Sequence, residues 1–154
     1  MEYRKAGPEG LDILVESRIL VLRAANGLGP EEDMAQIARE SRAYYEKALA
    51  DGSHAAWLAW EDGRIVGCGG ISFYQVMPTY HNPTGWKAYI MNMYTAPEYR
   101  RQGIAKGMLR LLVQEARDRG ITAISLEATE MGRPLYEACG FAAADSEMYL
   151  PVQK

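Results

Sequence analysis

The spacing of apolar residues predicts two helices in the first third of the chain. A stripe with helical periodicity begins after Pro8 and ends near Gly27, a residue type that favours helix termination. A second helix is expected over residues 30–50, because Pro30 with acidic residues behind it suits a first turn and Asp51-Gly52 suits an end. The apolar positions of the first stripe are Leu11, Leu14, Val15, Ile19 and Leu22.

From residue 55 onward the pattern is that of strands. A hairpin is expected around Asp62-Gly63, because this pair is typical of tight turns between strands. Glycines at positions 67, 69 and 70 of the return strand indicate a bulge or the close approach of another backbone segment. The strands predicted here are residues 55–60, 65–73 and 86–95, and a short first strand over residues 3–6 precedes the two helices.

The second half alternates helix and strand. The clearest helix covers residues 103–119, and the short apolar segment 121–126 is typical of a buried parallel strand. A short helix over residues 133–139 and a last strand over residues 141–150 follow. The order predicts one α/β domain over residues 1–154: a mixed sheet with an antiparallel N-terminal half, a parallel β-α-β C-terminal half, and helices on both faces. The apolar stripe of the long helix is Ile104, Met108, Leu111, Leu112 and Ala116.

Composition narrows the functional classes. The 154 residues are 48% hydrophobic and 24% charged, as in ordinary globular domains, and the net charge of -3 gives no general attraction for nucleic acid or anionic membranes. Cys68 and Cys139 lie in apolar surroundings without metal-ligand spacing, so reduced thiols and no metal are expected. The longest apolar run, residues 19–22, is too short to span a bilayer, and a cytoplasmic location is expected.

A basic loop with one glycine joins the strand 86–95 to the long helix. The first amides of a helix have no partner within it, and the helix dipole adds partial positive charge there. Gly103 permits close approach of a ligand, Ala105 is small, and Arg100 and Arg101 add positive charge. The loop therefore predicts a pyrophosphate site, although it lacks the glycines of the dinucleotide fingerprint and the Gly-Lys-Ser/Thr of a P-loop.

Two motifs carry a resemblance to a known family. Arg100-x-x-Gly103-x-Ala105 after a strand resembles the Arg/Gln-x-x-Gly-x-Gly/Ala signature of the GNAT acetyltransferases. Leu135-Tyr136-Glu137 followed by Gly140-Phe141 is similar to the Leu-Tyr-Glu-x-x-Gly-Phe motif of the same fold. The resemblance covers nearly the whole chain in element order. It implies direct transfer of an acetyl group from acetyl-CoA to an amine of a small molecule or peptide.

The resemblance also implies roles for individual residues. Acetyl-CoA would lie in a split between the strands 86–95 and 121–126, and Tyr136 would be the catalytic acid that protonates the departing thiolate. Pantetheine would bond to the backbone of Met93, Tyr94 and Thr95. The pyrophosphate would be held by Arg100, Arg101 and the amides of Gln102, Gly103, Ile104, Ala105 and Lys106.

The sequence does not assign the general base that would deprotonate the amine. Many relatives carry a glutamate on the strand before the basic loop, whereas here that strand contains no carboxylate and Asn92 could only orient a water. Glu127, Glu130 and His81 are the alternatives, beside a path through water. Thr129 stands near a position where relatives often use an asparagine to contact CoA, and it would make a shorter-reaching bond.

The acceptor is not identified by any motif. Five aromatic residues could line a cavity for a flat or cationic acceptor, or could equally be core and dimer contacts, and a homodimer is permitted. The missing strand carboxylate leaves an alternative function, a non-catalytic acyl-CoA-binding sensor, while Tyr136 favours the enzyme. The five aromatic residues are Tyr44, Tyr45, Tyr74, Tyr80 and Trp86.

Overall fold

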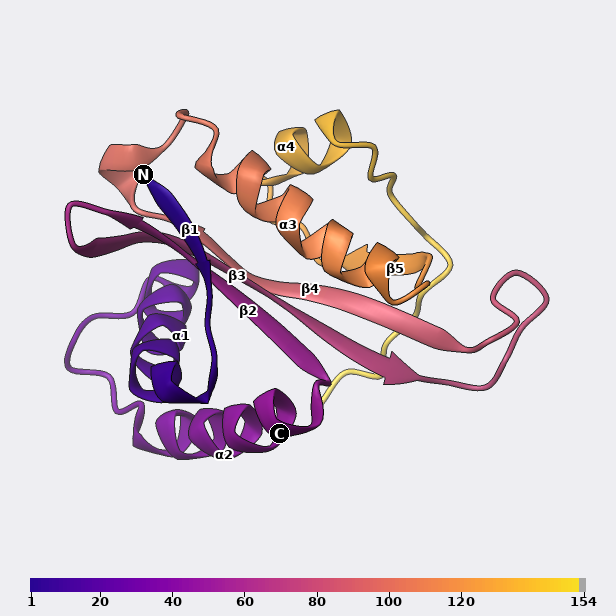
Figure 1. Ribbon diagram of the computed structural model, residues 1–154, viewed down its shortest axis with the longest axis horizontal. Coiled ribbons are helices and arrows are strands. Elements are labelled where there is room, and N and C mark those ends of the chain that lie inside the picture. The colour runs from indigo at the N-terminus through magenta and orange to yellow at the C-terminus, as the bar shows by residue number, and fades with distance from the viewer. Residues whose placement is uncertain (153–154) are drawn as a thin grey trace.

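A five-stranded sheet lies between two layers of helices in the computed structural model, which describes residues 1–152 (Figure 1). Helices α1 (Leu11–Asn26) and α2 (Ala35–Asp51) cover one face, and α3 (Ile104–Asp118) and α4 (Arg133–Ala138) lie on the other. Short 3-10 turns, η1 (Pro8–Gly10) and η2 (Pro97–Tyr99), precede α1 and follow β4. The strands are β1 (Glu2–Lys5), β2 (His54–Glu61), β3 (Arg64–Gln75), β4 (Trp86–Thr95) and β5 (Ala123–Leu126).

The sheet has the strand order β1-β2-β3-β4-β5. Neighbouring strands from β1 to β4 pair antiparallel, and β5 pairs parallel to β4 after the α3 crossover. The mixed sheet and the helices on both faces predicted from the sequence are therefore confirmed.

Two hydrophobic clusters, one on each face, hold the layers together. Under α3, the side chains of Met108, Leu109 and Leu112 are almost completely buried against β2, β3 and β4. The predicted stripe is correct except that Leu109 takes the place of Leu111, which is only partly buried. Under α1 and α2, a second cluster contains Leu14, Val15, Val21, Tyr45, Ala56, Leu58 and Cys68.

Close packing of α3 on the sheet explains a glycine in β3. A Cβ atom at Gly69 would lie 2.7 Å from Met108 Cγ and 2.9 Å from Leu112 Cδ1. A side chain there would push α3 away from the sheet. Of the two alternatives predicted for these glycines, the bulge is confirmed, because the register between β3 and β4 shifts between Cys68 and Gly70.

The second helix begins later than predicted, at Ala35 rather than Pro30. Residues 29–32 form a turn closed by a hydrogen bond from Glu32 N to Gly29 O (3.2 Å). The guanidinium of Arg23 donates to the carbonyls of Gly29 and Glu32, and Asp33 Oδ1 accepts from Ala35 N at 2.9 Å. These contacts satisfy the backbone in a non-helical form up to the start of α2.

The predicted last strand over residues 141–150 is wrong. The structure contains no strand over residues 141–152. Residues 142–147 are three alanines, an aspartate, a serine and a glutamate, which have low strand propensity and offer no apolar face to the sheet. Met148, Tyr149 and Leu150 are almost fully exposed.

None of the helices within residues 1–152 is long and apolar enough to cross a membrane.

Candidate active site

The sheet opens between β4 and β5. Residues 87–90 of β4 pair with residues 123–126 of β5, and β5 then ends (Figure 1). β4 continues to Thr95, pairing only with β3 on its other side. Residues 91–95 of β4 therefore have a free edge, and at about 3.3 Å per residue this edge is roughly 13 Å long. An extended ligand can add to such an edge as a strand would.

A bulge lies at the closed end of this split. Cys68 pairs with Tyr94 and Gly70 with Met91, so β4 carries one residue more than β3 between these pairs. Asn92 adopts a left-handed conformation with φ 61°, which is uncommon for a residue other than glycine. The Cys68 thiol donates to Asn92 O at 3.3 Å. The bulge turns the Asn92 side chain toward α1.

The residues expected to contact pantetheine all lie on the free edge. The Met93 side chain packs against the cluster under α3, and the Tyr94 ring packs against the cluster under α1 and α2. Ala96 N donates to Val66 O of β3 at 2.8 Å, so the N–H of the preceding residue, Thr95, points toward the open edge. Thr95 Oγ1 is buried without a hydrogen-bond partner among the described residues.

At the open end of the split, backbone amides without acceptors accumulate in residues 100–106, which we call the nest loop. None of the six amides of residues 101–106 has a hydrogen-bond acceptor in the described part of the chain, and the first helical bond is from Gly107 N to Gly103 O (3.0 Å). Arg101 and Gly103 have φ angles of 64° and 83°. Alternation of left-handed and right-handed residues turns successive amides toward one side and makes a concavity for anions. The helix dipole of α3 adds to the same effect.

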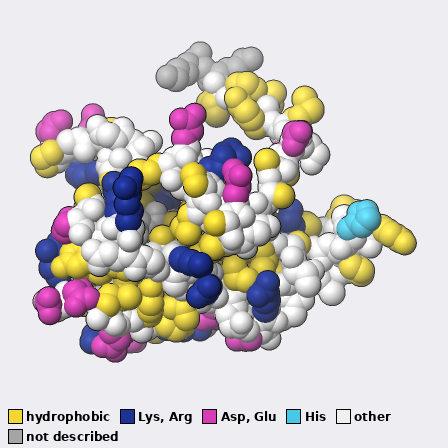
Figure 2. All heavy atoms as spheres, turned by 90° about the horizontal axis from the view of Figure 1, so that it is seen from above, with side chains coloured by type: hydrophobic (Ala, Val, Ile, Leu, Met, Phe, Trp, Pro, Cys, Tyr) yellow, Lys and Arg dark blue, Asp and Glu magenta, His cyan; other side chains and the backbone are white. Residues whose placement is uncertain are grey.

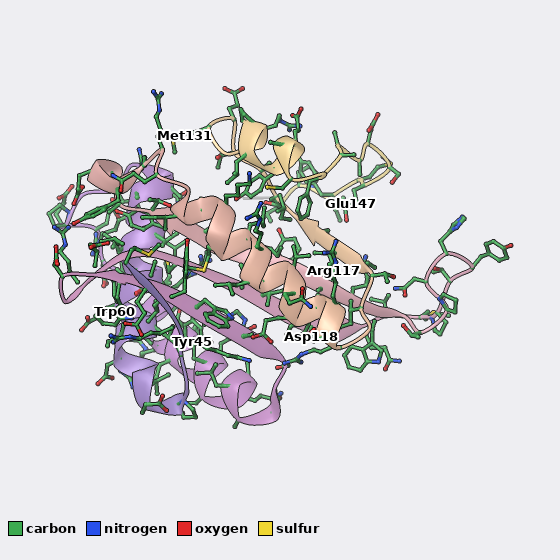
Figure 3. All side chains as sticks on the ribbon, turned by 45° about the horizontal axis from the view of Figure 1, so that its top comes forward. Tyr45, Trp60, Arg117, Asp118, Met131 and Glu147 are labelled. Carbon is green, nitrogen blue, oxygen red and sulfur yellow. The ribbon has the colours of Figure 1, made fainter. Side chains whose placement is uncertain are left out.

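The geometry of the nest loop fits a phosphate group. A Cβ atom at Gly103 would have no neighbour within 4 Å, so the space in front of this residue is open. Arg100 Nε donates to Thr95 O at 3.3 Å, which ties the loop to the end of β4. Arg100 Nη1 also lies 4.0 Å from Met131 Sδ, in the segment before α4, and Figure 3 shows Met131 at this end of the molecule.

Basic residues continue along α3. A hollow between α3 and α4 is lined by Lys106, Arg110 and Arg117 together with Val113 and Phe141. Figure 2 views this side of the molecule and shows Lys and Arg side chains spread among hydrophobic ones. The lining contains no aspartate or glutamate, so the hollow is locally basic in a chain with a net charge of -3.

Tyr136 projects from α4 on the same side of the sheet as α3. Its ring is half-buried against the cluster under α3 and meets Phe141 edge to face, with 6.1 Å between ring centres. Burial raises the pKa of the Tyr136 hydroxyl above its usual 10. No hydrogen bond from this hydroxyl is found within residues 1–152. The Tyr136 hydroxyl is thus protonated and has no protein acceptor among the described residues.

The three alternatives for a general base lie in different places. Glu127 and Glu130 are exposed, and His81 lies on the projecting loop between β3 and β4, edge to face with Tyr80. Thr129 Oγ1 already accepts a hydrogen bond from Gly132 N at 3.1 Å and so helps to begin α4. Glu127 is the alternative nearest the closed end of the split, because it directly follows Leu126, which pairs with Ile90. Burial, and after it the charge of Glu127, raises the pKa of Tyr89 in β4.

The five aromatic residues considered for the acceptor do not gather in one place. Tyr45 belongs to the core, with 4% of its surface exposed, and Figure 3 shows it beneath the sheet. Tyr80 is almost fully exposed on the loop between β3 and β4. Tyr44 is engaged in a polar cluster, with its hydroxyl 2.9 Å from His54 Nδ1 and 2.7 Å from Ser72 Oγ. Tyr45 is therefore a core residue, as one part of the alternative of core and dimer contacts expects, and the five residues do not form one group.

His54 was not recognised from the sequence as a special residue. It is buried, its Nε2 has no hydrogen-bond partner among the described residues, and a Cβ at Gly70 would lie 2.8 Å from this atom. Burial, and after it the charge of Arg18, lowers the pKa of His54 from 6.5 to about 4. The imidazole is therefore neutral in the folded protein at physiological pH.

We expect His54 to make the protein sensitive to mild acid. Between pH 6.5 and 4 the unfolded chain binds a proton at His54 and the folded chain does not, so stability is lost as the pH falls through this window. From pH 7 to pH 5 the loss from this group is roughly 2 kcal/mol. Urea unfolding of the wild type and His54→Gln at both pH values measures it. The variant should lose less stability on acidification, whereas His81→Gln, which alters the exposed histidine, should behave as the wild type does.

The comparisons with known proteins agree with this architecture. The model of the acetyltransferase (GNAT) family matches residues 21–141. A predicted acetyltransferase from Clostridium acetobutylicum, solved with acetyl-CoA, superimposes with a TM-score of 0.88 at 39% identity, over 97% of this chain and 95% of that one. The chain belongs to the acetyltransferase (GNAT) family.

Curated relatives share only part of their length with this chain. The uncharacterized N-acetyltransferase YsnE of Bacillus subtilis (strain 168) is 34% identical over 90 residues, which are 55% of this chain and 54% of that protein. The probable N-acetyltransferase family 8 member 5 of Mus musculus is 30% identical over 128 residues, 80% of this chain and 54% of that protein. The chain spans about half the length of the curated relatives it matches.

Proposed function

We propose that the protein is an N-acetyltransferase that binds acetyl-CoA in the β4–β5 split and transfers its acetyl group directly to an amine. The observation that carries the proposal is the run of six amides without acceptors in the nest loop, at the open end of a free strand edge. A CoA ester has the matching shape: an anionic pyrophosphate followed by an extended arm that carries amide groups. The acetyl-CoA in the related Clostridium acetobutylicum structure supports the same choice of donor.

Each part of the split has a role in this proposal. The amides of residues 102–106 hold the pyrophosphate, and Arg100 and Arg101 add positive charge beside it. The arm runs back along β4 and bonds to the backbone of Met93, Tyr94 and Thr95. The thioester then lies at the closed end of the split, next to the bulge at Asn92.

The proposed reaction is a direct displacement. The lone pair of the acceptor amine forms a bond to the thioester carbon, the carbon–sulfur bond breaks, and the sulfur leaves as a thiolate. Tyr136 donates its proton to that thiolate, a role consistent with a raised pKa that keeps the hydroxyl protonated. The amine must lose a proton before or during attack, and we assign this step to water, since no carboxylate stands on residues 91–95.

The absence of a carboxylate from residues 91–95 of β4 favours testing a second function, that of a non-catalytic sensor of acyl-CoA. A sensor that binds acyl-CoA without turnover would need the nest loop and the free edge, and it would not need a base on β4. A tyrosine hydroxyl without a protein partner has no evident use in such a sensor. This difference favours the enzyme.

We expect acetyl-CoA to raise the melting temperature progressively with its concentration, because a ligand that binds only the folded state stabilises it by mass action. CoA should act similarly, and the response to a longer acyl-CoA measures acyl-chain preference. In parallel, thiol release with a panel of amines measures transfer. Release with any amine supports the enzyme, a thermal shift without release supports the sensor, and no shift with any CoA compound refutes both.

A further inference from the structure

Helix α1 places an arginine against the bulge of β4. Arg18 Nη1 donates to Asn92 Oδ1 at 3.1 Å, across 74 residues of sequence. Asn92 lies two residues beyond Ile90, the last residue of β4 that pairs with β5. The guanidinium therefore lies at the closed end of the split, on the α1–α2 face, whereas the nest loop leads to α3 on the opposite face.

The positive charge of Arg18 has no compensating partner. Arg18 is half-buried, and it forms no ion pair with any aspartate or glutamate within residues 1–152. Asn92 is neutral and occupies one of the five N–H donors of the guanidinium. Arginines that are removed from water are normally paired with an acid, because a lone desolvated charge is costly.

The titratable groups around Arg18 do not supply that acid. Burial raises the pKa of Tyr45 and of Cys68 to about 12, so both are neutral, and His54 with its lowered pKa is neutral as well. Cys68 shares Asn92 with Arg18, because its thiol donates to Asn92 O at 3.3 Å, and the charge of Arg18 contributes to the pKa shift of each of the three groups. Arg18 is therefore the one charged member of this group of four side chains.

We propose that Arg18 binds an acidic group of the acceptor, so that the acceptors are amines that carry a carboxylate or a phosphate. The inference rests on the proposed function and specifies its substrate class. The planar fork of arginine matches both anions with two parallel hydrogen bonds. An acceptor anchored at Arg18 would have its amine held near the thioester, which the proposed function locates beside Asn92.

The test compares matched pairs of acceptors that differ only in the acidic group. The probes are α-amino acids with their amides, and glucosamine 6-phosphate with glucosamine. For the wild type we expect kcat/KM at least tenfold higher for the acidic member of one pair, and the pair that responds distinguishes a carboxylate from a phosphate. In Arg18→Gln, which keeps a donor for Asn92, this ratio should fall to within about threefold of one.

Two further variants separate recognition from stability. Arg18→Lys keeps the charge but loses the fork, so it should retain part of the preference. Arg39→Gln removes an exposed cation from α2 and should leave the preference unchanged. A preference that persists in Arg18→Gln, or a wild type that treats both members of every pair alike, would overturn the inference while leaving the transferase intact.

A binding measurement decides the inference even without turnover. Calorimetric titration of the same pairs into the protein saturated with CoA should show tighter binding of the acidic member, and Arg18→Gln should abolish the difference. Equal affinity for the acidic and neutral members of every pair in the wild type would overturn the inference. Loss of CoA binding itself would instead contradict the proposed function.

Discussion

Gly103→Phe is expected to weaken acetyl-CoA binding at least a hundredfold, which corresponds to about 2.7 kcal/mol. The Cβ position of this residue faces open space, with no atom within 4 Å, and the proposal puts the pyrophosphate in that space. A phenyl group there would exclude the phosphate oxygens from the amides of the nest loop. Calorimetric titration with acetyl-CoA measures the effect.

The chain offers a matched control for the backbone strain of this change. Gly103 has φ 83°, and a residue with a side chain is strained there by about 1–2 kcal/mol. Gly120, at the other end of α3, has φ 74° and also has no atom within 4 Å of its Cβ position. Gly120→Phe should therefore lower the melting temperature to a similar extent and leave acetyl-CoA affinity unchanged. Equal affinities in the two variants would remove the nest loop from the binding site.

Most of the fold could be predicted because its signals are local. The Asp62-Gly63 turn and the stripe of α3 each depend on residues within a few positions of one another. The start of α2 could not be predicted, because Arg23 of α1 holds the carbonyls of Gly29 and Glu32 in a turn. The failed last strand has a different cause: Tyr149 and its neighbours have strand-like composition but find no sheet edge.

In the candidate site, too, the local features could be predicted and the contacts between distant parts of the chain could not. The nest loop lies within one continuous segment, so its glycine, its arginines and the helix that follows could be recognised together. The contact between Arg18 and Asn92 joins residues 74 positions apart, and no spacing rule connects them. The glycines of β3 indicated a bulge, but that the bulge turns Asn92 of β4 toward α1 depends on the register of the two strands, which the sequence does not reveal. The neutral state of His54 could not be predicted from the sequence, because its pKa is lowered mainly by burial in the folded protein and not by its sequence neighbours.

Tyr136→Phe should lower kcat by about ten- to a thousandfold and leave acetyl-CoA affinity nearly unchanged, the range for loss of one acid catalyst. The substitution removes only the hydroxyl oxygen, so the edge-to-face contact with Phe141 and the half-buried ring persist. Because that hydroxyl has no partner within residues 1–152, its removal leaves no buried group unpaired. The folded state should therefore be as stable as the wild type.

Tyr99→Phe is the matched control for this change. Tyr99 is also half-buried against the cluster under α3, and its hydroxyl likewise has no partner in the described part of the chain. Single-turnover transfer with acetyl-CoA bound in advance isolates the chemical step from donor binding. Loss of rate in Tyr136→Phe alone supports the acid catalyst, because both variants lose the same atom from the same cluster. An unaltered rate would return Tyr136 to the core, and thiolate departure would then depend on solvent.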